Sequence, residues 1–169
     1  SKTDRVERWS IFEIAVTGKK DGNPFTDYEI HGVFFHRCQT VTVGGFYDGD
    51  GVYKLRFMPS FEGEYQYEIS GSFSDETVSG SFIVTPPSAG NHGPVRVANT
   101  YHFAYEDGTP HYSIGTTCYV WHLQSEELQE QTLETLKNSA FNKIRFCVFP
   151  KHYDYNLKEP FCYPFEGSK

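Results

Sequence analysis

Short runs of alternating hydrophobic and polar residues follow one another from Trp9 to Val84, and turn-forming residues separate them. In the run VYKLRF, Tyr53, Leu55 and Phe57 would share one face of a strand, with charged residues on the other face. The run EYQYEI (residues 64–69) repeats this pattern. A period of two is typical of strands with one buried and one wet face. Because no helical pattern intervenes, the alternation predicts an antiparallel β-sandwich of the immunoglobulin-like kind.

Turn-forming residues support the same fold. The sequence DGDG at residues 48–51 and the pair Glu62–Gly63 have the composition of tight hairpin turns, and NPF at residues 23–25 is interpreted as a break between strands. The later sequence TPPSAGNHGPV is rich in proline, glycine and small polar residues, which favours a boundary between domains. We therefore expect a sandwich domain over residues 5–86 and a linker over residues 87–98.

A different pattern begins after the linker. The run SIGTTCYVW predicts a strand that ends near Trp121, and SEELQEQTLETLKNS predicts a helix that Ser125 caps and that carries a stripe of leucines. The run FNKIRFCVFP (residues 141–150) is apolar on both faces, which is typical of a parallel strand covered by helices. Residues 99–169 therefore predict one strand–helix–strand (βαβ) unit.

One such unit is not a complete domain. Two parallel strands and one helix leave sheet faces and edges uncovered. A (β/α)8 barrel needs roughly 250 residues, so residues 99–169 can supply only its start. Two alternatives stay open: the chain is a fragment, or these elements fold back onto the sandwich. An open parallel edge would also favour self-association through that edge.

The charge balance and the cysteines narrow the function classes. A formal net charge of −7 without any cluster of lysine and arginine argues against nucleic acid and anionic membranes as partners. No segment approaches a membrane span, and no apolar leader is visible. We expect a cytoplasmic location, because the cysteine pattern favours free thiols and a reducing compartment, or an extracellular one if a leader has been removed. The four cysteines lack CxxC spacing, which favours free thiols over zinc, although three disulfide pairings are formally possible. We expect no metal ion and no cofactor.

Several motifs, taken in order, resemble one family. They are GFYDGDG, EGEYQYEI, NHGPV and DGTPHYSIGTTCYVW, followed by FNKIRFCVFP. Together they resemble bacterial glycoside hydrolases in which an N-terminal immunoglobulin-like domain of unknown function precedes an apiosidase-like (β/α)8 catalytic domain. The resemblance covers nearly the whole chain. It implies that SIGTTCYVW is the first barrel strand and that NKIRFCVFP is the second.

The resemblance also implies a reaction. Glycosidases of this kind use two carboxylates, one to protonate the leaving oxygen and the other to attack or to activate water. The resemblance places both after later barrel strands, which this sequence does not contain. We therefore assign no catalytic residue and expect the chain by itself to be inactive.

Substrate binding is what the two predicted barrel strands can contribute, because barrel sites form at the C-terminal ends of strands. The candidates are Tyr119, Trp121, Arg145 and Lys151. The two aromatic rings can either stack on a sugar or pack under the following loop. Arg145 can either brace a catalytic carboxylate and lower its pKa or point outward. Lys151 can reach the site or be a solvated loop lysine, and the loop His152–Asn156 offers further sugar-binding groups.

Two other functions compete with the hydrolase fragment. In one, the sandwich is a carbohydrate-binding module, and the aromatic content of 17% would then include exposed rings on one face. In the other, the sandwich is a purely structural interaction domain that packs against the barrel. Fold alone does not separate these readings. The expected partners are an oligo- or polysaccharide and the rest of the catalytic barrel.

Overall fold

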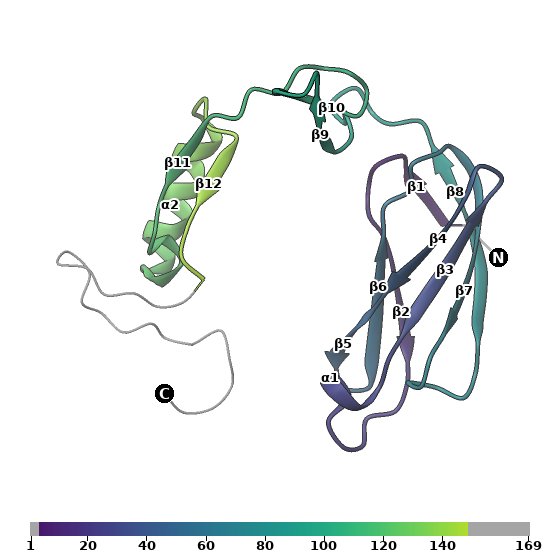
Figure 1. Ribbon diagram of the computed structural model, residues 1–169. Coiled ribbons are helices and arrows are strands. Elements are labelled where there is room, and N and C mark those ends of the chain that lie inside the picture. The colour runs from purple at the N-terminus through teal and green to yellow at the C-terminus, as the bar shows by residue number, and fades with distance from the viewer. Residues whose placement is uncertain (1–3, 149–169) are drawn as a thin grey trace. The chain divides into compact units, whose positions relative to one another are not determined.

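A computed structural model describes residues 4–148 of the protein. The chain divides into two compact units, residues 1–110 and residues 111–169, whose elements are labelled in Figure 1. Lys151 and the loop His152–Asn156, which the sequence predicts to bind substrate, lie outside the described residues. The domain limits expected at residues 86 and 98 stay a prediction.

Two β-sheets form the sandwich of the first unit (Figure 1). Their strands are β1 (Asp4–Glu7), β2 (Phe12–Thr17), β3 (His31–His36), β4 (Gln39–Gly44), β5 (Phe46–Gly49), β6 (Val52–Phe57), β7 (Gly63–Ser70) and β8 (Val78–Thr85). One sheet has the order β1-β8-β7-β3-β4, and the other has the order β2-β6-β5. β1 pairs with β8 in parallel, and the other neighbours in these two sheets are antiparallel.

The predicted alternation places side chains of both sheets in the core. In β6, Tyr53, Leu55 and Phe57 are buried, and in β7, Tyr65 and Ile69 are buried. Each of these strands turns its charged residues to the opposite, more exposed face. The prediction of a mainly β protein with a β-sandwich is confirmed, and its immunoglobulin-like topology stays a prediction.

Aromatic rings fill the centre of this core. Phe34 of β3 is fully buried, and its ring stacks on the ring of Phe57 at a centroid distance of 4.2 Å. The rings of Phe12 and Phe82 each meet the ring of Phe34 nearly edge-on at 6.3 Å, and Tyr67 lies at 6.0 Å. Edge-on and offset contacts of this kind add to the free energy gained by burying the rings. The high aromatic content is therefore explained largely by the core.

One of the two predicted hairpin turns is confirmed and the other is wrong. Asp50 and Gly51 have φ of 50° and 79° and connect the antiparallel strands β5 and β6, as a tight hairpin turn requires. Glu62–Gly63 instead leads from β6 to β7, which lie in different sheets. Gly63 has φ of 110°, a backbone conformation that favours glycine. This glycine therefore allows the chain to cross from one sheet to the other and does not form a hairpin turn.

A short helix occupies the segment that the sequence marks only as a break. α1 (Pro24–Asp27) begins with proline, and the side-chain oxygen of Asn23 accepts a hydrogen bond from the N–H of Phe25 at 3.3 Å. Asparagine before the helix and proline at its first position are favourable at a helix start. The helix lies beside β5 at one end of the sandwich (Figure 1).

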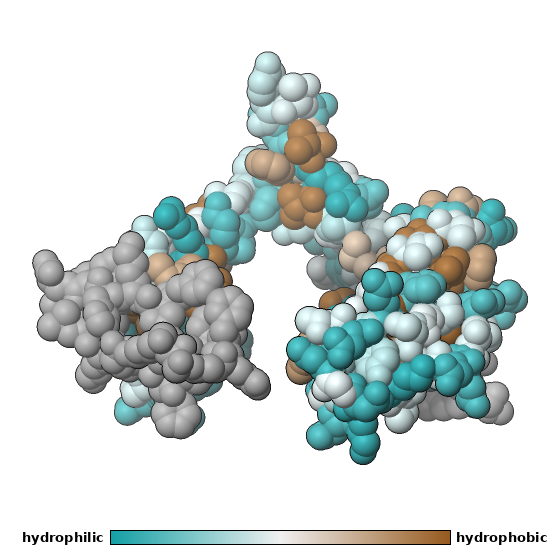
Figure 2. Space-filling view, turned by 60° about the horizontal axis from the view of Figure 1, so that its bottom comes forward, coloured by the Kyte–Doolittle hydropathy of each residue, from teal (hydrophilic) through white to brown (hydrophobic). Residues whose placement is uncertain are grey.

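A two-stranded hairpin follows the sandwich within the first unit. It consists of β9 (Val95–Ala98) and β10 (His102–Tyr105), which pair in antiparallel fashion. Val97 and Phe103 are cross-strand partners on one face, and they are 68% and 52% exposed. Hydrophobic atoms at this part of the chain are visible in brown in Figure 2. The hairpin therefore presents an apolar face, although β9 lies in the segment expected to be a linker.

The second unit contains the predicted βαβ arrangement. Its elements are β11 (Gly115–Thr117), the 3₁₀ helix η1 (Trp121–Leu123), α2 (Glu126–Lys137) and β12 (Lys143–Arg145). β11 and β12 pair in parallel, with α2 between them in the sequence. The described residues of the second unit contain a single βαβ unit, so the barrel itself stays a prediction.

The predicted helix cap is confirmed, whereas the predicted burial of the second strand is not. The hydroxyl oxygen of Ser125 accepts a hydrogen bond from the N–H of Leu128 at 3.4 Å, and two glutamates occupy the first turn. β12 is only three residues long, and Phe146 and Val148 beyond it are 42% and 62% exposed. Within the described residues β12 has one strand neighbour, so the apolar run is not covered on both faces. No helix of residues 4–148 has the length and apolar character of a membrane span.

Candidate functional site

The two parallel strands of the second unit keep pairing beyond their last residues. The N–H of Cys118 donates to the carbonyl oxygen of Arg145 at 2.9 Å, and the N–H of Cys147 donates to the carbonyl oxygen of Tyr119 at 2.9 Å. The C-terminal ends of the strands therefore lie side by side. Tyr119 and Arg145 meet at this edge, as the predicted binding role requires.

Arg145 lies on the exposed face of the strand pair. Successive side chains of a strand point to opposite faces, so Arg145 and Ile144 face in opposite directions. Ile144 lines an apolar pocket together with Leu133 of α2, whereas Arg145 is exposed. The guanidinium carbon of Arg145 lies 5.4 Å from the centroid of the Tyr119 ring, which is a cation–π distance. Its predicted role toward a sugar or a carboxylate stays a prediction.

Trp121 is half-buried beneath the strand ends. Its indole N–H donates to the carbonyl oxygen of Gln129 in α2 at 3.2 Å, and its ring meets the ring of Phe146 at 5.9 Å. These contacts agree with the packing alternative for this residue. Trp121 also lines two pockets of about 350 Å³ and about 620 Å³, and Tyr119 lines the larger one. Both candidate rings therefore remain next to accessible space.

The described residues that line these two pockets include aromatic, aliphatic and amide side chains but no acidic ones. In the described part of the chain, neither pocket has an aspartate or glutamate in its lining, so no pair of carboxylates is available for glycoside hydrolysis. The buried Nδ1 of His122, beside Trp121, has no hydrogen-bond partner among residues 4–148. Buried polar atoms nearly always have a partner.

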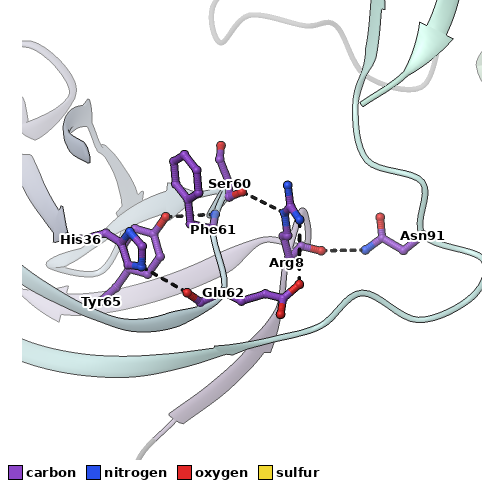
Figure 3. Close-up of polar contacts among 7 residues, drawn as sticks. All are labelled: Arg8, His36, Ser60, Phe61, Glu62, Tyr65 and Asn91. Carbon is purple, nitrogen blue, oxygen red and sulfur yellow. Dashed lines mark hydrogen bonds and ion pairs between the residues drawn. The ribbon is translucent and has the colours of Figure 1, made fainter. Parts of the chain in front are cut away.

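A group of polar contacts connects the segment that leaves the sandwich to loops of the sandwich (Figure 3). Arg8 lies at its centre: its Nε donates to the carbonyl oxygen of Ser60 at 2.8 Å, and its guanidinium lies 3.8 Å from the carboxylate of Glu62. The side-chain amide of Asn91 donates to the carbonyl oxygen of Arg8 at 3.0 Å. We name Glu7, Arg8, Ser60, Glu62 and Asn91 the junction network. It joins the start of the sandwich, the loop between its sheets and the segment that leaves it.

Glu7 and Asn91 fasten the outgoing segment. The backbone N–H of Ser88 donates to the Glu7 carboxylate at 2.7 Å, and the Asn91 amide lies 3.2 Å from the same carboxylate. These hydrogen bonds, that of Ser88 first, lower the pKa of Glu7. Asn91 also accepts the N–H of Gly93 at 3.2 Å. The segment around residues 88–93 is therefore bonded to the sandwich and is no free linker there.

His36 supports the same loop from the other side (Figure 3). Its Nδ1 accepts the N–H of Cys38 at 3.2 Å, so the proton of the neutral ring is on Nε2, which donates to the carbonyl oxygen of Glu62 at 3.1 Å. The imidazole stacks between Phe61 and Tyr65, with centroid distances of 5.4 Å and 4.7 Å. Both ring nitrogens are used, so His36 serves packing rather than catalysis.

The structure also reveals an aromatic groove that the sequence did not indicate. It has a volume of about 420 Å³ and lies between α1 and β5 in the first unit. Its walls include Phe25, Tyr28, Glu29, His31, Phe46 and Tyr47. A signal was present in the sequence, because a phenylalanine in the polar segment NPFTD has no core strand to belong to. Its partners, however, lie about twenty positions further on.

Other site chemistry is limited. Residues 4–148 contain no group of three or more His, Cys, Asp or Glu side chains that could hold a metal ion. Cys38 and Cys118 carry free thiols. His92 pairs with Asp107 at 2.7 Å, and the pKa of Asp107 is lowered by the backbone N–H of Thr109 first and by His92 second. This pair closes the turn after β10.

A family model and a solved structure are similar to this chain. Residues 5–72 match the model of a family described as a domain of unknown function (DUF5060). A comparison with curated proteins gives no match. Among solved structures, the chain is similar to the crystal structure of "a putative glycoside hydrolase from Bacteroides vulgatus ATCC 8482", with 42% sequence identity and a TM-score of 0.90. The similarity covers 99% of this chain and 33% of that protein, so this chain spans about a third of its length.

Proposed function

We propose that this chain is the N-terminal part of a carbohydrate-active glycoside hydrolase. The observation that carries the proposal is the 42% identity over 99% of the chain to a protein described as a "putative glycoside hydrolase". That similarity includes both units, so it is not confined to a widespread sandwich fold. In this proposal the sandwich is an accessory domain, and the βαβ unit is the first part of an apiosidase-like (β/α)8 barrel.

The roles of the residues follow from where they lie. Tyr119 and Arg145 meet at the C-terminal ends of the two parallel strands, where barrel enzymes bind substrate. Trp121 adds an aromatic wall, and Lys151, six positions after Arg145 in the sequence, is the fourth residue proposed to bind substrate. The two catalytic carboxylates would come from later strands. The substrate would be an oligo- or polysaccharide, and the rest of the barrel would cover the open sheet edge, which otherwise invites self-association. The location would be cytoplasmic, or extracellular if a leader precedes the chain.

The test compares two proteins, one that consists of residues 1–169 and one that is translated from the full reading frame containing them. Both are assayed for hydrolysis of aryl glycosides and plant oligosaccharides. We expect hydrolysis by the longer protein and none by the shorter one. Arg145→Ala in the longer protein should lower kcat/KM, whereas Arg37→Ala, which changes an exposed arginine in the turn between β3 and β4, should not. A reading frame that ends at Lys169, or a longer protein that hydrolyses no glycoside, would reject the proposal.

A further inference from the structure

The aromatic groove between α1 and β5 has the form of a small-molecule binding site. Its floor is formed by the buried side chains of Ile30 and Tyr53, and its walls by the aromatic residues of α1 and β5. A volume of about 420 Å³ falls within the range typical of ligand sites, and polar groups share the lining with the aromatic rings. The groove is separate from the strand ends of the second unit, and the proposed hydrolysis does not use it.

Phe25 is held in place although 73% of its surface is exposed. Asn23 and Asp27 fix the single turn of α1 on both sides, because the Asp27 carboxylate accepts the N–H of Asn23 at 2.8 Å. The ring of Phe25 packs edge-on against the ring of Tyr47 at 5.0 Å. An exposed aromatic ring with a fixed position loses little conformational entropy when it binds a ligand. The exposed ring of Phe25 therefore forms an ordered aromatic wall of the groove.

The polar groups of the groove favour a neutral ligand with many hydroxyls. Glu29 supplies an exposed carboxylate, which only accepts hydrogen bonds. The hydroxyl oxygen of Tyr47 accepts the N–H of Gly51 at 3.0 Å and keeps its own proton for a second partner. Within the described part of the chain, no lysine or arginine lines the groove. Arg56 contacts the ring of Phe46 from outside the groove, but Glu13 pairs with it at 2.6 Å. His31 also lines the groove, but its Nε2 already contacts the hydroxyl of Ser70 at 3.1 Å, so an anionic ligand would find little counter-charge.

We propose that the aromatic groove binds a neutral sugar residue of a glycan, whose C–H face stacks on Phe25 and whose hydroxyls donate to Glu29. The choice of a glycan rests on the proposed function, since a glycoside hydrolase meets such polymers. Aromatic grooves also bind proline-rich peptides. Proline has no N–H, however, so such peptides offer mainly acceptors, which a carboxylate cannot use. Sugar hydroxyls supply the donors that Glu29 requires.

Affinity electrophoresis of residues 1–169 tests the site. The protein is run in native gels that contain xyloglucan, galactomannan or arabinogalactan as neutral probes, polygalacturonate as an anionic probe, or no polysaccharide. We expect retardation by at least one neutral polymer and none by polygalacturonate. Phe25→Ala should weaken binding about tenfold or more. The stacking contact of an aromatic ring alone accounts for up to about a tenfold change in Kd, and the loss of buried apolar surface weakens binding further.

Two matched variants separate the groove from general effects. A Cβ atom added at Gly44, which lines the groove, would meet no atom within 4 Å, so Gly44→Val should fold normally and narrow the groove. Phe35 is 42% exposed on β3 and does not line the groove, so Phe35→Ala should bind like the parent chain. Circular dichroism and thermal unfolding show whether each variant is folded.

Several results would overturn the inference. They are the absence of retardation by every neutral polymer, undiminished retardation of the Phe25→Ala and Gly44→Val variants, and calorimetric binding of a decaproline peptide without glycan binding. The hydrolysis assay of the longer protein is independent of these results. Hydrolysis without retardation rejects the groove alone, whereas retardation without hydrolysis rejects the proposed function alone.

Discussion

Replacing Asn91 by alanine should release the segment that leaves the sandwich. The Asn91 side chain bonds two backbone groups: it donates to the carbonyl oxygen of Arg8 at 3.0 Å and accepts the N–H of Gly93 at 3.2 Å. A hydrogen bond of this kind contributes about 0.5–1.5 kcal/mol, so these two hold the segment by about 1–3 kcal/mol, and the bond from the Asn91 amide to the Glu7 carboxylate makes this a lower estimate. This range corresponds to a change of about 5- to 150-fold in the population of the released segment.

Hydrogen exchange measures that population directly. A peptide that covers residues 86–94 reports the segment, and a peptide from β7 (Gly63–Ser70) reports the sandwich core. Because local opening and global unfolding are separate events, Asn91→Ala should speed exchange in the first peptide about 5- to 150-fold and leave the second unchanged. Equal acceleration in both peptides would mean that Asn91 stabilises the whole sandwich. No acceleration in either would refute the role of the junction network.

Asn91→Asp provides a sharper comparison. Aspartate keeps the oxygen that accepts the N–H of Gly93, but it lacks the N–H groups that donate to Arg8 and Glu7. It also places a second carboxylate beside that of Glu7, because the Asn91 amide nitrogen lies 3.2 Å from the Glu7 carboxylate. Like charges at this distance repel. At neutral pH the aspartate variant should therefore release the segment more than the alanine variant does. The excess should shrink as the pH falls and one of the two carboxylates is protonated. A pH-independent difference would contradict this explanation.

Three further changes test the fold. Phe34→Ala removes the ring at the centre of the core and should lower the free energy of unfolding of the first unit by about 3–5 kcal/mol, measured by urea titration. Thr100 has φ of 67° in the turn between β9 and β10, so Thr100→Gly should stabilise the hairpin and slow its hydrogen exchange, whereas Thr100→Val should speed it. The pKa of Glu7 is lowered in the folded state, so its bonds stabilise the fold above the ordinary pKa of 4.5 and lose effect as the pH falls below it. The thermal midpoint should drop in that acidic range, and less so for Glu7→Gln.

Local sequence patterns predicted those parts of the fold that local physics determines. The alternation in β6 and β7 located the buried faces, the sequence around Asp50 and Gly51 located a hairpin, and Ser125 located the start of α2. Each of these features depends on residues that lie close together in the sequence. The parallel pairing of β11 and β12 followed from the helix between them, because parallel neighbours need a crossover connection.

Features that depend on distant partners were not accessible in the same way. The composition of Glu62–Gly63 suits a hairpin, but the pairing of β7 with β3 and β8 sends the chain to the other sheet. Phe25 and Tyr47 meet only because α1 lies beside β5. Pro24 after Asn23 is a helix-start signal, but NPF is interpreted from the sequence only as a break between strands. The ring that packs against Phe25 cannot be identified without the register of β5 and β6.

The junction network and the aromatic groove make different predictions for a longer protein, and these separate a glycan-binding role of the sandwich from a structural one. If the groove binds glycan, it raises the effective concentration of a polymer at a catalytic site in the same chain. Phe25→Ala should then lower hydrolysis of a polysaccharide and leave hydrolysis of a small aryl glycoside unchanged. Asn91→Ala should also lower hydrolysis of the polysaccharide relative to the aryl glycoside, but by less, because a flexible linker still attaches the sandwich to the catalytic part of the chain. If neither variant changes the ratio of the two rates, the sandwich does not bind substrate and its role is structural.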